Sequence, residues 1–502
     1  MIFGVEDAQR GFDLECDALV VGSGAGGAVA AANLARAGLR TVVLEAGPQI
    51  TSAEMTRDAP MFLARYFWEG GLRFVEGSSL SPSLQARCLG GSTVVNSAIM
   101  LPLPSWVRQA WAEESQLPLF TDEALEGAYE RIFALTHTAP TPLSVMGRRN
   151  LSVRDALESM GMRGAPLPRA VQGCEGCADC LTGCVSGSKQ SVDRSVLPQA
   201  VADGAQVWTC AEVERITTRG RRATGVEGRF VHPITRQRGA RFRVRARHVV
   251  LAAGAAQTPM LLLQSGIHQR RTVGASFFAH LGGGAVGIMH EVIDPWIGAT
   301  QGWGAVHKEI PGLKYECLWA SPSVLMVRWG DIGQPFMERL HEVKHATVIA
   351  VVYRGKVEGR VRRSFGGRPR MFLRIPDAEA HVVFRGLQVA AEGLLKAGAR
   401  YVHTGVPGAV DEMQSVEDTH SLLRPSLRAK DMRMTMNHIF GSCPMHRDPR
   451  RGTVDGEGKV HDFEGLYVCD ASLFPSPSAV NPQATIMALA DLISRRIGEM
   501  SR

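Results

Sequence analysis

Residues 17–27 read DALVVGSGAGG, and this stretch decides the fold. Its first residues form an apolar run of the kind found in buried parallel strands. The glycines that follow match the spacing G-x-G-x-x-G, and the alanine-rich segment after them predicts a helix over residues 25–37. A second apolar run at 40–45 completes a strand–helix–strand unit. The stretch therefore predicts a Rossmann-type nucleotide-binding domain.

Each glycine of this turn has a physical role in holding a dinucleotide. The first permits the tight turn, the second lets the backbone approach a pyrophosphate, and the third lets the helix pack on the strand. The pyrophosphate is then placed at the N-terminus of the helix, where free N–H groups and the helix dipole favour an anion. The turn residues that we assign to the nucleotide are Gly22, Ser23, Gly24, Ala25 and Gly27.

Glu45 ends the second predicted strand, about 20 residues after the first glycine. A carboxylate at this place can accept hydrogen bonds from both ribose hydroxyls of an adenosine. The strand, the helix and this acid together indicate a dinucleotide site. They do not separate NAD from FAD.

The rest of the chain predicts more strands of the same sheet and a second domain. Apolar runs at 205–210, 248–253 and 465–468 are assigned to the nucleotide domain. Strand-like runs at 346–353 and 370–375 flank a polar, turn-rich segment, which predicts an antiparallel meander. A helix is predicted from about 378 to 396, ending at Gly398. The fold class is therefore α/β, with a second domain built on an antiparallel sheet covered by helices.

Composition excludes some classes of partner. The formal net charge is only +7, and aromatic residues make up 6% of the chain. Arginine-rich stretches at 215–222 and 236–247 are interpreted as solvated strand and loop faces. Because nucleic-acid binding needs a basic face with aromatic platforms, we expect no nucleic-acid partner.

The start of the chain shows no basic and apolar regions typical of a secretory signal. Residues 18–37 are apolar, but they are interrupted by glycines and polar residues, so we expect no transmembrane segment. Ten cysteines without such a signal indicate thiols in a reducing compartment. The expected location is the cytoplasm.

Five further stretches occur in a fixed order along the chain. They are RCLGGSTVVN at 87–96, GAAQTPMLLLQSGI at 254–267, HIFGSCPM at 438–445, GLYVCDAS at 465–472 and NP at 481–482. Together with the glycine turn, they resemble the signatures of the glucose–methanol–choline (GMC) oxidoreductases, a family of FAD enzymes. The resemblance extends over nearly the whole chain. It implies that the Rossmann-type domain binds FAD.

The resemblance also implies catalytic roles. His438 matches the catalytic histidine of the family, and Asn481 matches its partner position, which is His or Asn. Oxidising an alcohol requires a base for the hydroxyl proton and an acceptor for the hydride, which flavin N5 provides. An imidazole that titrates near neutrality suits the first role. Asn481 would orient the substrate oxygen by hydrogen bonding.

Further positions are implied to contact the cofactor. Asn96 would lie near the isoalloxazine, and the backbone of Val213 would meet the adenine. The helix predicted after Pro482 would direct its N-terminus at the flavin, where negative charge grows on reduction. Val95 stands where some members carry a flavin-linking histidine, so we expect FAD bound without a covalent link. The remaining residues assigned to FAD are Gly91, Ser92, Asp470 and Ala471.

This assignment divides the chain into discontinuous domains. The FAD-binding domain is expected to comprise residues 1–105, 190–275 and 430–502. Residues 106–189 are expected to form a lid and cysteine-rich segment, and residues 276–429 the substrate-binding domain.

Four cysteines, Cys174, Cys177, Cys180 and Cys184, have the spacing C-x2-C-x2-C-x3-C. This is the spacing of bacterial ferredoxin runs, in which the fourth cysteine ligates a different cluster. An iron–sulfur cluster, a zinc ion or unmetallated structural thiols are all consistent with the pattern. A subset of the family, the long-chain alcohol oxidases and dehydrogenases, shows a similar cysteine-rich stretch followed by a segment like GSKQS at 187–191.

The expected function is FAD-dependent oxidation of a small-molecule alcohol. With a cluster, electrons would leave one at a time to an electron-transfer partner, as in a dehydrogenase. With structural cysteines, oxygen would serve as the acceptor, as in an oxidase. A non-catalytic, dinucleotide-binding regulatory protein is the alternative from another class. It would have no need of both His438 and Asn481.

Overall fold

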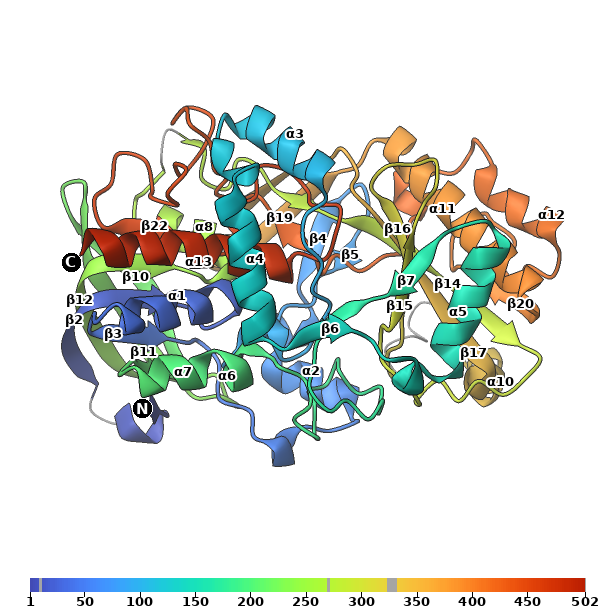
Figure 1. Ribbon diagram of the computed structural model, residues 1–502, viewed down its shortest axis with the longest axis horizontal. Helices are drawn as coiled ribbons and strands as arrows, with labels where there is room; N and C mark the ends of the chain where they lie inside the picture. The colour runs from blue at the N-terminus through green and yellow to red at the C-terminus, as the bar shows by residue number, and fades with distance from the viewer. Residues whose placement is uncertain (9–10, 269–270, 323–331, 502) are drawn as a thin grey trace.

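The computed structural model describes all residues except 9–10, 269–270, 323–331 and 502. The molecule is elongated, with the nucleotide-binding sheet at one end and a second large sheet at the other (Figure 1). Both termini lie at the first end. None of the described helices combines the length and apolar composition needed to cross a bilayer.

The first sheet has eight strands and contains the predicted strand–helix–strand unit. Strand β2 (Phe12–Val21) pairs in parallel with β3 (Thr41–Leu44) on one side and with β12 (Arg238–Leu251) on the other. Helix α1 (Ala25–Arg36) connects β2 to β3. The other strands are β1 (Ile2–Phe3), β9 (Gln206–Trp208), β10 (Ala211–Arg219), β11 (Arg222–Val231) and β22 (Leu466–Val468).

Segments far apart in the sequence complete this sheet, as predicted. β9 pairs in parallel with β3, and β22 pairs in parallel with the C-terminal part of β12. β10, β11 and β12 are antiparallel neighbours, and they carry the arginine-rich stretches. Exposed arginines there pair with acids, for example Arg243 with Glu227 at 2.7 Å. These stretches are therefore solvated strand faces.

The second sheet is a six-stranded antiparallel sheet, in the order β20-β14-β17-β16-β15-β7. Helices α5 (Gly147–Ser159) and α11 (Asp377–Lys396) pack on it, as expected for a sheet covered by helices. The strands are β7 (Gly164–Pro166), β14 (Leu281–Met289), β15 (Trp303–Val306), β16 (Leu313–Cys317), β17 (Ala346–Tyr353) and β20 (Ala399–His403).

The predicted meander between residues 346 and 375 is wrong. β17 belongs to the six-stranded sheet, whereas β19 (Pro369–Arg374) belongs to a separate four-stranded sheet. The polar segment between them contains a strand of its own, β18 (Glu358–Arg363), which pairs with β19. β19 also pairs with β4 (Phe74–Gly77), which in turn pairs with β5 (Ser81–Pro82). The polarity pattern of residues 346–375 alone could not show that a strand from residues 74–77 would pair with the free edge of β19.

The remaining described helices surround the two large sheets (Figure 1). Helix α13 packs against α1 and α4 at the nucleotide-binding end. The helices are α2 (Ala59–Tyr66), α3 (Ser105–Ser115), α4 (Glu123–Leu135), α6 (Val192–Ser195), α7 (Leu197–Ala202), α8 (Gly254–Gln264), α10 (Gln334–Glu342), α12 (Val416–Thr419) and α13 (Gln483–Met500).

Strands cross the predicted domain boundaries. β7, from the segment 106–189, is an edge strand of the six-stranded sheet, and β4 joins strands from the segment 276–429. Two short pairs also connect distant segments: β13 (Phe278–Ala279) with β21 (Ile439–Phe440), and β6 (Thr138–Pro140) with β8 (Pro168–Ala170). The three-part division of the chain stays a prediction.

Candidate active site

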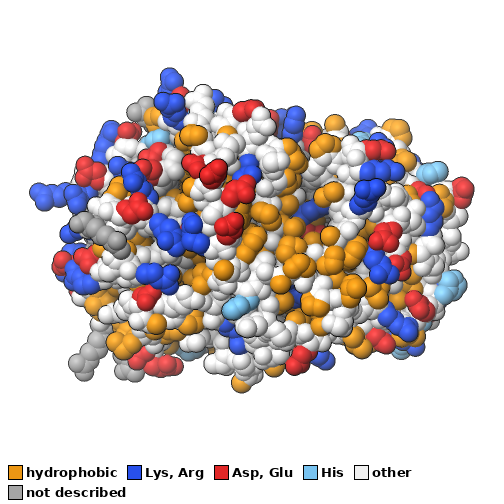
Figure 2. All heavy atoms as spheres, viewed as in Figure 1, with side chains coloured by type: hydrophobic (Ala, Val, Ile, Leu, Met, Phe, Trp, Pro, Cys, Tyr) orange, Lys and Arg blue, Asp and Glu red, His pale blue; other side chains and the backbone are white. Residues whose placement is uncertain are grey.

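A cavity of about 2300 Å³ is lined by residues of both halves of the molecule. Its walls include the glycine turn after β2, the loop at 91–97, strands of the six-stranded sheet and the start of α13. On the face shown in Figure 2, apolar side chains gather towards the middle, where the two halves meet, and charged side chains of both signs are interspersed around them. The cavity is far larger than a typical small-ligand pocket, so it has room for a dinucleotide and a substrate.

The glycine turn has the geometry that a dinucleotide requires. Gly22 has a φ of +99°, and a Cβ on it would lie 2.4 Å from the Ala252 carbonyl oxygen. A Cβ on Gly27 would lie 1.9 Å from the Gly22 carbonyl oxygen. A Cβ on Gly24, by contrast, would meet only the Cα of Gly91, at 3.9 Å, within the described residues. Close packing of the protein therefore explains why positions 22 and 27 are glycine. The open space at Gly24 favours close approach of a ligand to the backbone.

The N-terminus of α1 is directed at this space. Gly24 is its N-cap, and no described side chain caps the free N–H groups there. Ala25 is the first residue of the helix and lines the cavity. Backbone donors at a helix N-terminus bind anions such as phosphate. The turn thus fits the pyrophosphate of FAD on its own geometry.

Glu45 is buried at the end of β3 and stabilises the glycine turn by hydrogen bonds. One carboxylate oxygen accepts hydrogen bonds from the backbone N–H and the hydroxyl of Ser23, at 3.0 and 2.6 Å. The other oxygen accepts from the N–H of Gly47 at 2.8 Å. The Ser23 hydroxyl in turn accepts from the N–H of Gly90 at 3.1 Å. Burial raises the pKa of Glu45 against these hydrogen bonds.

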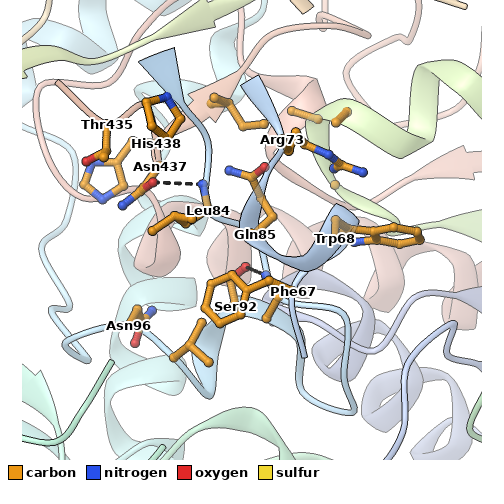
Figure 3. Close-up of a pocket in the computed structure, with 18 of the residues that line it drawn as sticks. Phe67, Trp68, Arg73, Leu84, Gln85, Ser92, Asn96, Thr435, Asn437 and His438 are labelled. Carbon is orange, nitrogen blue, oxygen red and sulfur yellow. Dashed lines mark hydrogen bonds between the residues drawn. The ribbon is translucent and has the colours of Figure 1, made fainter. Parts of the chain in front are cut away.

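The loop that contains Gly91, Ser92 and Asn96 borders the cavity (Figure 3). A Cβ on Gly91 would lie 2.9 Å from the Cα of Gly24, so the loop lies against the glycine turn. The Ser92 hydroxyl accepts a hydrogen bond from the N–H of Ala86 at 3.1 Å. The Asn96 amide donates to Gln483, in the first turn of α13, and its oxygen accepts from the N–H of Ala98 at 2.9 Å. This loop therefore connects the glycine turn to the helix that was expected to face the flavin.

The remaining residues assigned to FAD also border the cavity. Val213 lies in β10 beside a bulge in the pairing with β11. Asp470 and Ala471 follow β22. The Asp470 carboxylate accepts from the N–H groups of Gly254 and Ser472 at 2.9 and 2.8 Å. Burial raises the pKa of Asp470.

His438 and Asn481 border the same cavity. His438 immediately precedes β21 and lies beside Asn437, whose amide oxygen accepts from the N–H of Leu84 at 3.0 Å (Figure 3). Asn481 precedes α13, with Pro482 as the N-cap of the helix. The pairing of β21 with β13 brings His438 against His280, and their Nδ1 atoms are 3.1 Å apart.

Asn481 is held by a buried ion pair that the sequence did not reveal. Lys314 Nζ donates to Glu316 Oε1 at 2.6 Å, and it also donates to the amide oxygen of Asn481. Asn481 Nδ2 lies 3.5 Å from Glu316 Oε2, and Gln301 donates to that oxygen at 3.0 Å. Because an ammonium group only donates, Lys314 fixes the amide orientation of Asn481. Among the residues that the structure describes, no second partner accepts from Asn481 Nδ2, so its other hydrogen is available to a group in the cavity.

The pair comes from the alternation of β16. Lys314 and Glu316 are two residues apart, so they lie on one face of the strand, whereas Leu313, Tyr315 and Cys317 point to the other. Leu313 packs against α11, where a Cβ on Gly386 would lie 3.3 Å from it. The sequence KYE contained this alternation, but nothing in it indicated that the charged face would be buried under Asn481.

Burial strongly affects the pKa values, and hence the charges, of the titratable side chains in the site. Burial, with a smaller contribution from Lys314, lowers the pKa of His438 to about 4, so its imidazole is neutral at physiological pH. Burial and the neighbouring His438 lower the pKa of His280 well below its usual value. Burial would raise the pKa of Glu316, but Lys314 outweighs this effect and the pKa falls. The site therefore contains two neutral imidazoles beside a buried ion pair.

The four cysteines lie around a second, small cavity of about 10 Å³. Arg169 and Lys189 border it and are almost completely buried. All ten cysteines of the chain are free thiols. Within the described parts of the chain, no three His, Cys, Asp or Glu side chains are grouped so that they could hold a metal ion. The thiols thus share a cavity without forming a ready single-ion site.

Two segments of the chain match GMC oxidoreductase family models: residues 16–282 match the N-terminal domain and residues 357–490 the C-terminal domain. These matches cover more than half of the chain. The chain belongs to the GMC oxidoreductase family, and its fold is the FAD-binding fold of that family.

Individual relatives agree with this assignment. An uncharacterised GMC-type oxidoreductase of Mycobacterium tuberculosis is 34% identical over 477 residues, which cover 94% of this chain and 74% of the relative. A long-chain-alcohol oxidase of Arabidopsis thaliana is 27% identical over 524 residues, covering 98% and 68%. The crystal structure of pyridoxine 4-oxidase from Mesorbium loti superposes with a TM-score of 0.72 at 18% identity, covering 96% of this chain and 99% of that one.

Proposed function

We propose that this enzyme oxidises an alcohol to a carbonyl compound, with His438 as the general base. The observation that carries the proposal is a neutral imidazole that borders the same cavity as an asparagine whose N–H is directed by the Lys314–Glu316 ion pair. When bound, FAD supplies the hydride acceptor at its N5 atom. His438 takes the hydroxyl proton of the alcohol, and Asn481 donates a hydrogen bond to the substrate oxygen.

The ion pair supports this role through charge and orientation. Lys314 lies behind Asn481, and its charge is held in place by Glu316 on the same strand. A positive charge near the substrate oxygen stabilises the negative charge that grows on that oxygen as the proton leaves. A preorganised donor such as Asn481 needs no reorganisation at that moment.

Apolar side chains near His438 support an alcohol with an apolar body. Leu84, Met432 and Met434 border the cavity, and the last two are only six and four residues before the histidine. The Arabidopsis relative acts on long-chain alcohols by name. We therefore propose long-chain or similarly apolar alcohols as the first substrates to test, with sterols and polyols for comparison.

The test is the loss of activity in His438→Ala. We expect the rate at which alcohol bleaches the flavin without oxygen to fall on the order of 10²–10⁴-fold. FAD content is expected to stay near that of the wild type, because the pyrophosphate and adenosine contacts lie at the other end of the cavity. His341→Ala, on the exposed side of α10, is the matched control. Near-normal bleaching in His438→Ala would assign the base to another residue.

We also propose that Cys174, Cys177, Cys180 and Cys184 bind an iron–sulfur cluster. Buried, positively charged side chains beside these cysteines support this proposal. Within the described residues, Lys189 donates to backbone carbonyl oxygens, those of Val94, Asn96 and Cys180. The charge of Asp193 acts on it without an ion-pair contact. Burial lowers the pKa of Lys189, so further negative charge beside it would stabilise its charged form.

Arg169 supports the same proposal. It is completely buried, and its Nη1 has no hydrogen-bond partner among the residues that the structure describes. Its Nη2 donates to the sulfur of Cys180 at 3.7 Å. Burial would raise the pKa of the Cys180 thiol, but the charges of Lys189 and Arg169 outweigh it and the pKa falls. Thiolates and bridging sulfides would supply this further negative charge, and soft thiolate ligands suit iron–sulfur clusters.

Such a cluster would accept the two electrons of the oxidation singly. Because the cavity between the four sulfurs holds only about 10 Å³, the loop at 174–184 would have to open outwards around it. Lys189 also connects this loop to Asn96, and hence to the flavin end of the large cavity. An external electron carrier is then the proposed partner.

Metal analysis tests this proposal. Protein purified without oxygen is expected to contain iron and acid-labile sulfide, which Cys180→Ser should largely lose. Cys16→Ser, a buried cysteine in β2, is the matched control and should keep them. Fully FAD-loaded, active protein with neither iron nor sulfide would overturn the cluster. Zinc in its place would indicate a structural metal, and activity with oxygen alone would indicate an oxidase.

A further inference from the structure

His280 has no role in the function proposed above, yet it is the closest polar contact of His438. It is 5% exposed and lies between β13 and β14, at the bottom of the cavity. Its ring meets that of His438 nearly edge to face, at 5.2 Å between centroids and 85° between planes. Its backbone N–H donates to the His438 carbonyl at 3.1 Å. Both the main chain and the side chain of His280 thus hold His438.

The two ring nitrogens of His280 have different partners, and these decide where its hydrogen lies. Nε2 is hydrogen-bonded to the carbonyl oxygen of Ser478, which can only accept. The Ser478 hydroxyl donates to the Val480 carbonyl at 2.7 Å, so it has no hydrogen to offer to Nε2. Nε2 of His280 therefore carries the hydrogen. In a neutral imidazole, Nδ1 is then the acceptor.

The same reasoning shows which ring nitrogen of His438 carries its hydrogen. His280 Nδ1 lies 3.1 Å from His438 Nδ1, and since the first must accept, the second must donate. A neutral His438 that carries its hydrogen on Nδ1 has a free lone pair on Nε2. We infer that His280 is a positioning residue that holds His438 in the tautomer with a basic Nε2, and that the Ser478 carbonyl sets this chain of hydrogen bonds.

This inference rests on the proposed role of His438 as base and makes that role more specific. The proton of the alcohol moves to His438 Nε2, the hydride moves to FAD, and the Nδ1 hydrogen of His438 stays where it is. The imidazolium formed in this step keeps its hydrogen bond to His280 Nδ1, which is an uncharged acceptor. In many hydrolases a carboxylate fixes the tautomer of the catalytic histidine, and loss of that partner is costly.

The charges around the pair favour the neutral state of His280. Lys314 and Arg354 face it, together with His438, and all of them oppose a positive charge on its ring. The opposite charge of Glu316 acts on His438. A protonated His280 would donate from both nitrogens, so it could no longer accept from His438. The surroundings thus protect the acceptor role of Nδ1.

Two substitutions separate positioning from simple structural support. In His280→Asn, the side-chain oxygen can take the place of Nδ1 and accept from His438, whereas His280→Leu removes the acceptor. We expect flavin bleaching by alcohol to slow on the order of 10–10³-fold in the Leu variant, mainly in kcat, and to recover largely in the Asn variant. His307→Leu, another buried histidine of the same half, is the matched control.

The tautomer itself is measurable without turnover. In the FAD-loaded enzyme labelled with ¹⁵N-histidine, with His438→Ala used for assignment, the wild type is expected to show a protonated Nδ1 and a bare Nε2 at His438. The Leu variant should lose this preference and the Asn variant should keep it. A wild-type His438 protonated on Nε2, or an unchanged tautomer and rate in His280→Leu, would overturn the inference. Normal bleaching in His438→Ala would instead refute the base, whatever the tautomer.

Discussion

At the scale of residues, the environment of His438 determines how it can act. A general base must be unprotonated when the substrate arrives, and burial achieves this here by holding the pKa near 4. The same burial makes the base weaker, so the substrate oxygen needs help in losing its proton. In the proposed mechanism, the Lys314–Glu316 pair and Asn481 would supply that help.

This environment predicts the pH dependence of the reaction. A histidine with an ordinary pKa of about 6.5 would lose activity as the pH falls through that value. With the pKa of His438 lowered to about 4, the base stays neutral as the pH falls to weakly acidic values. We expect kcat/KM to be level through neutrality and to fall only as the pH approaches 4 to 5, about 2 units below the ordinary limit.

The measurement is kcat/KM for the best alcohol as a function of pH, with FAD content and folding checked at each point. Lys314→Met should move the acid limb to higher pH, because the charge of Lys314 contributes to the low pKa of His438. If kcat/KM of the wild type already fell at a pH at or above the ordinary pKa of histidine, this result would contradict the buried, neutral state of His438.

At the scale of elements, the loop at 91–97 decides how the cofactor is held. It lies between the glycine turn and the start of α13, and Gly91 approaches Gly24 so closely that a Cβ on Gly91 would lie 2.9 Å from the Gly24 Cα. Val95, at the position of the linking histidine in some relatives, is 7% exposed and packs with Phe62, Tyr66 and Phe67. An apolar side chain in that place offers no nucleophile to the flavin.

We therefore expect FAD to be bound tightly but without a covalent link. Denaturing the purified protein with acid and removing the precipitate should leave all of the yellow colour in solution, as measured by flavin absorbance in the two fractions. Flavin that stays with the precipitated chain through repeated washing would contradict this expectation. It would also show that another side chain of the cavity forms the link.

At the scale of the whole molecule, the function depends on the meeting of two sheets. The nucleotide turn belongs to the eight-stranded sheet, whereas Lys314 and Glu316 belong to the six-stranded antiparallel sheet at the other end (Figure 1). His438 and Asn481 come from the C-terminal part of the chain. Neither sheet alone contains the proposed catalytic arrangement.

The sequence by itself determined the Rossmann turn, the place of Glu45, the family and the positions of His438 and Asn481. These features are local: a strand, a glycine turn and a helix start follow one another within a few residues, and their spacing reflects backbone geometry that is the same wherever the unit occurs. The helix after Asn481 and the distant strands of the first sheet were predictable for the same reason.

Only the tertiary structure decided what surrounds those residues. His280 and His438 are 158 residues apart, and Lys314 and Asn481 are 167 apart. The pairing of β4 with β19 could not be predicted from the sequence either. A strand pattern indicates that a strand has an edge, but it does not indicate which segment pairs with that edge. Contacts of this kind depend on the packing of whole sheets, where a buried charge is tolerated only next to the partner that folding brings to it.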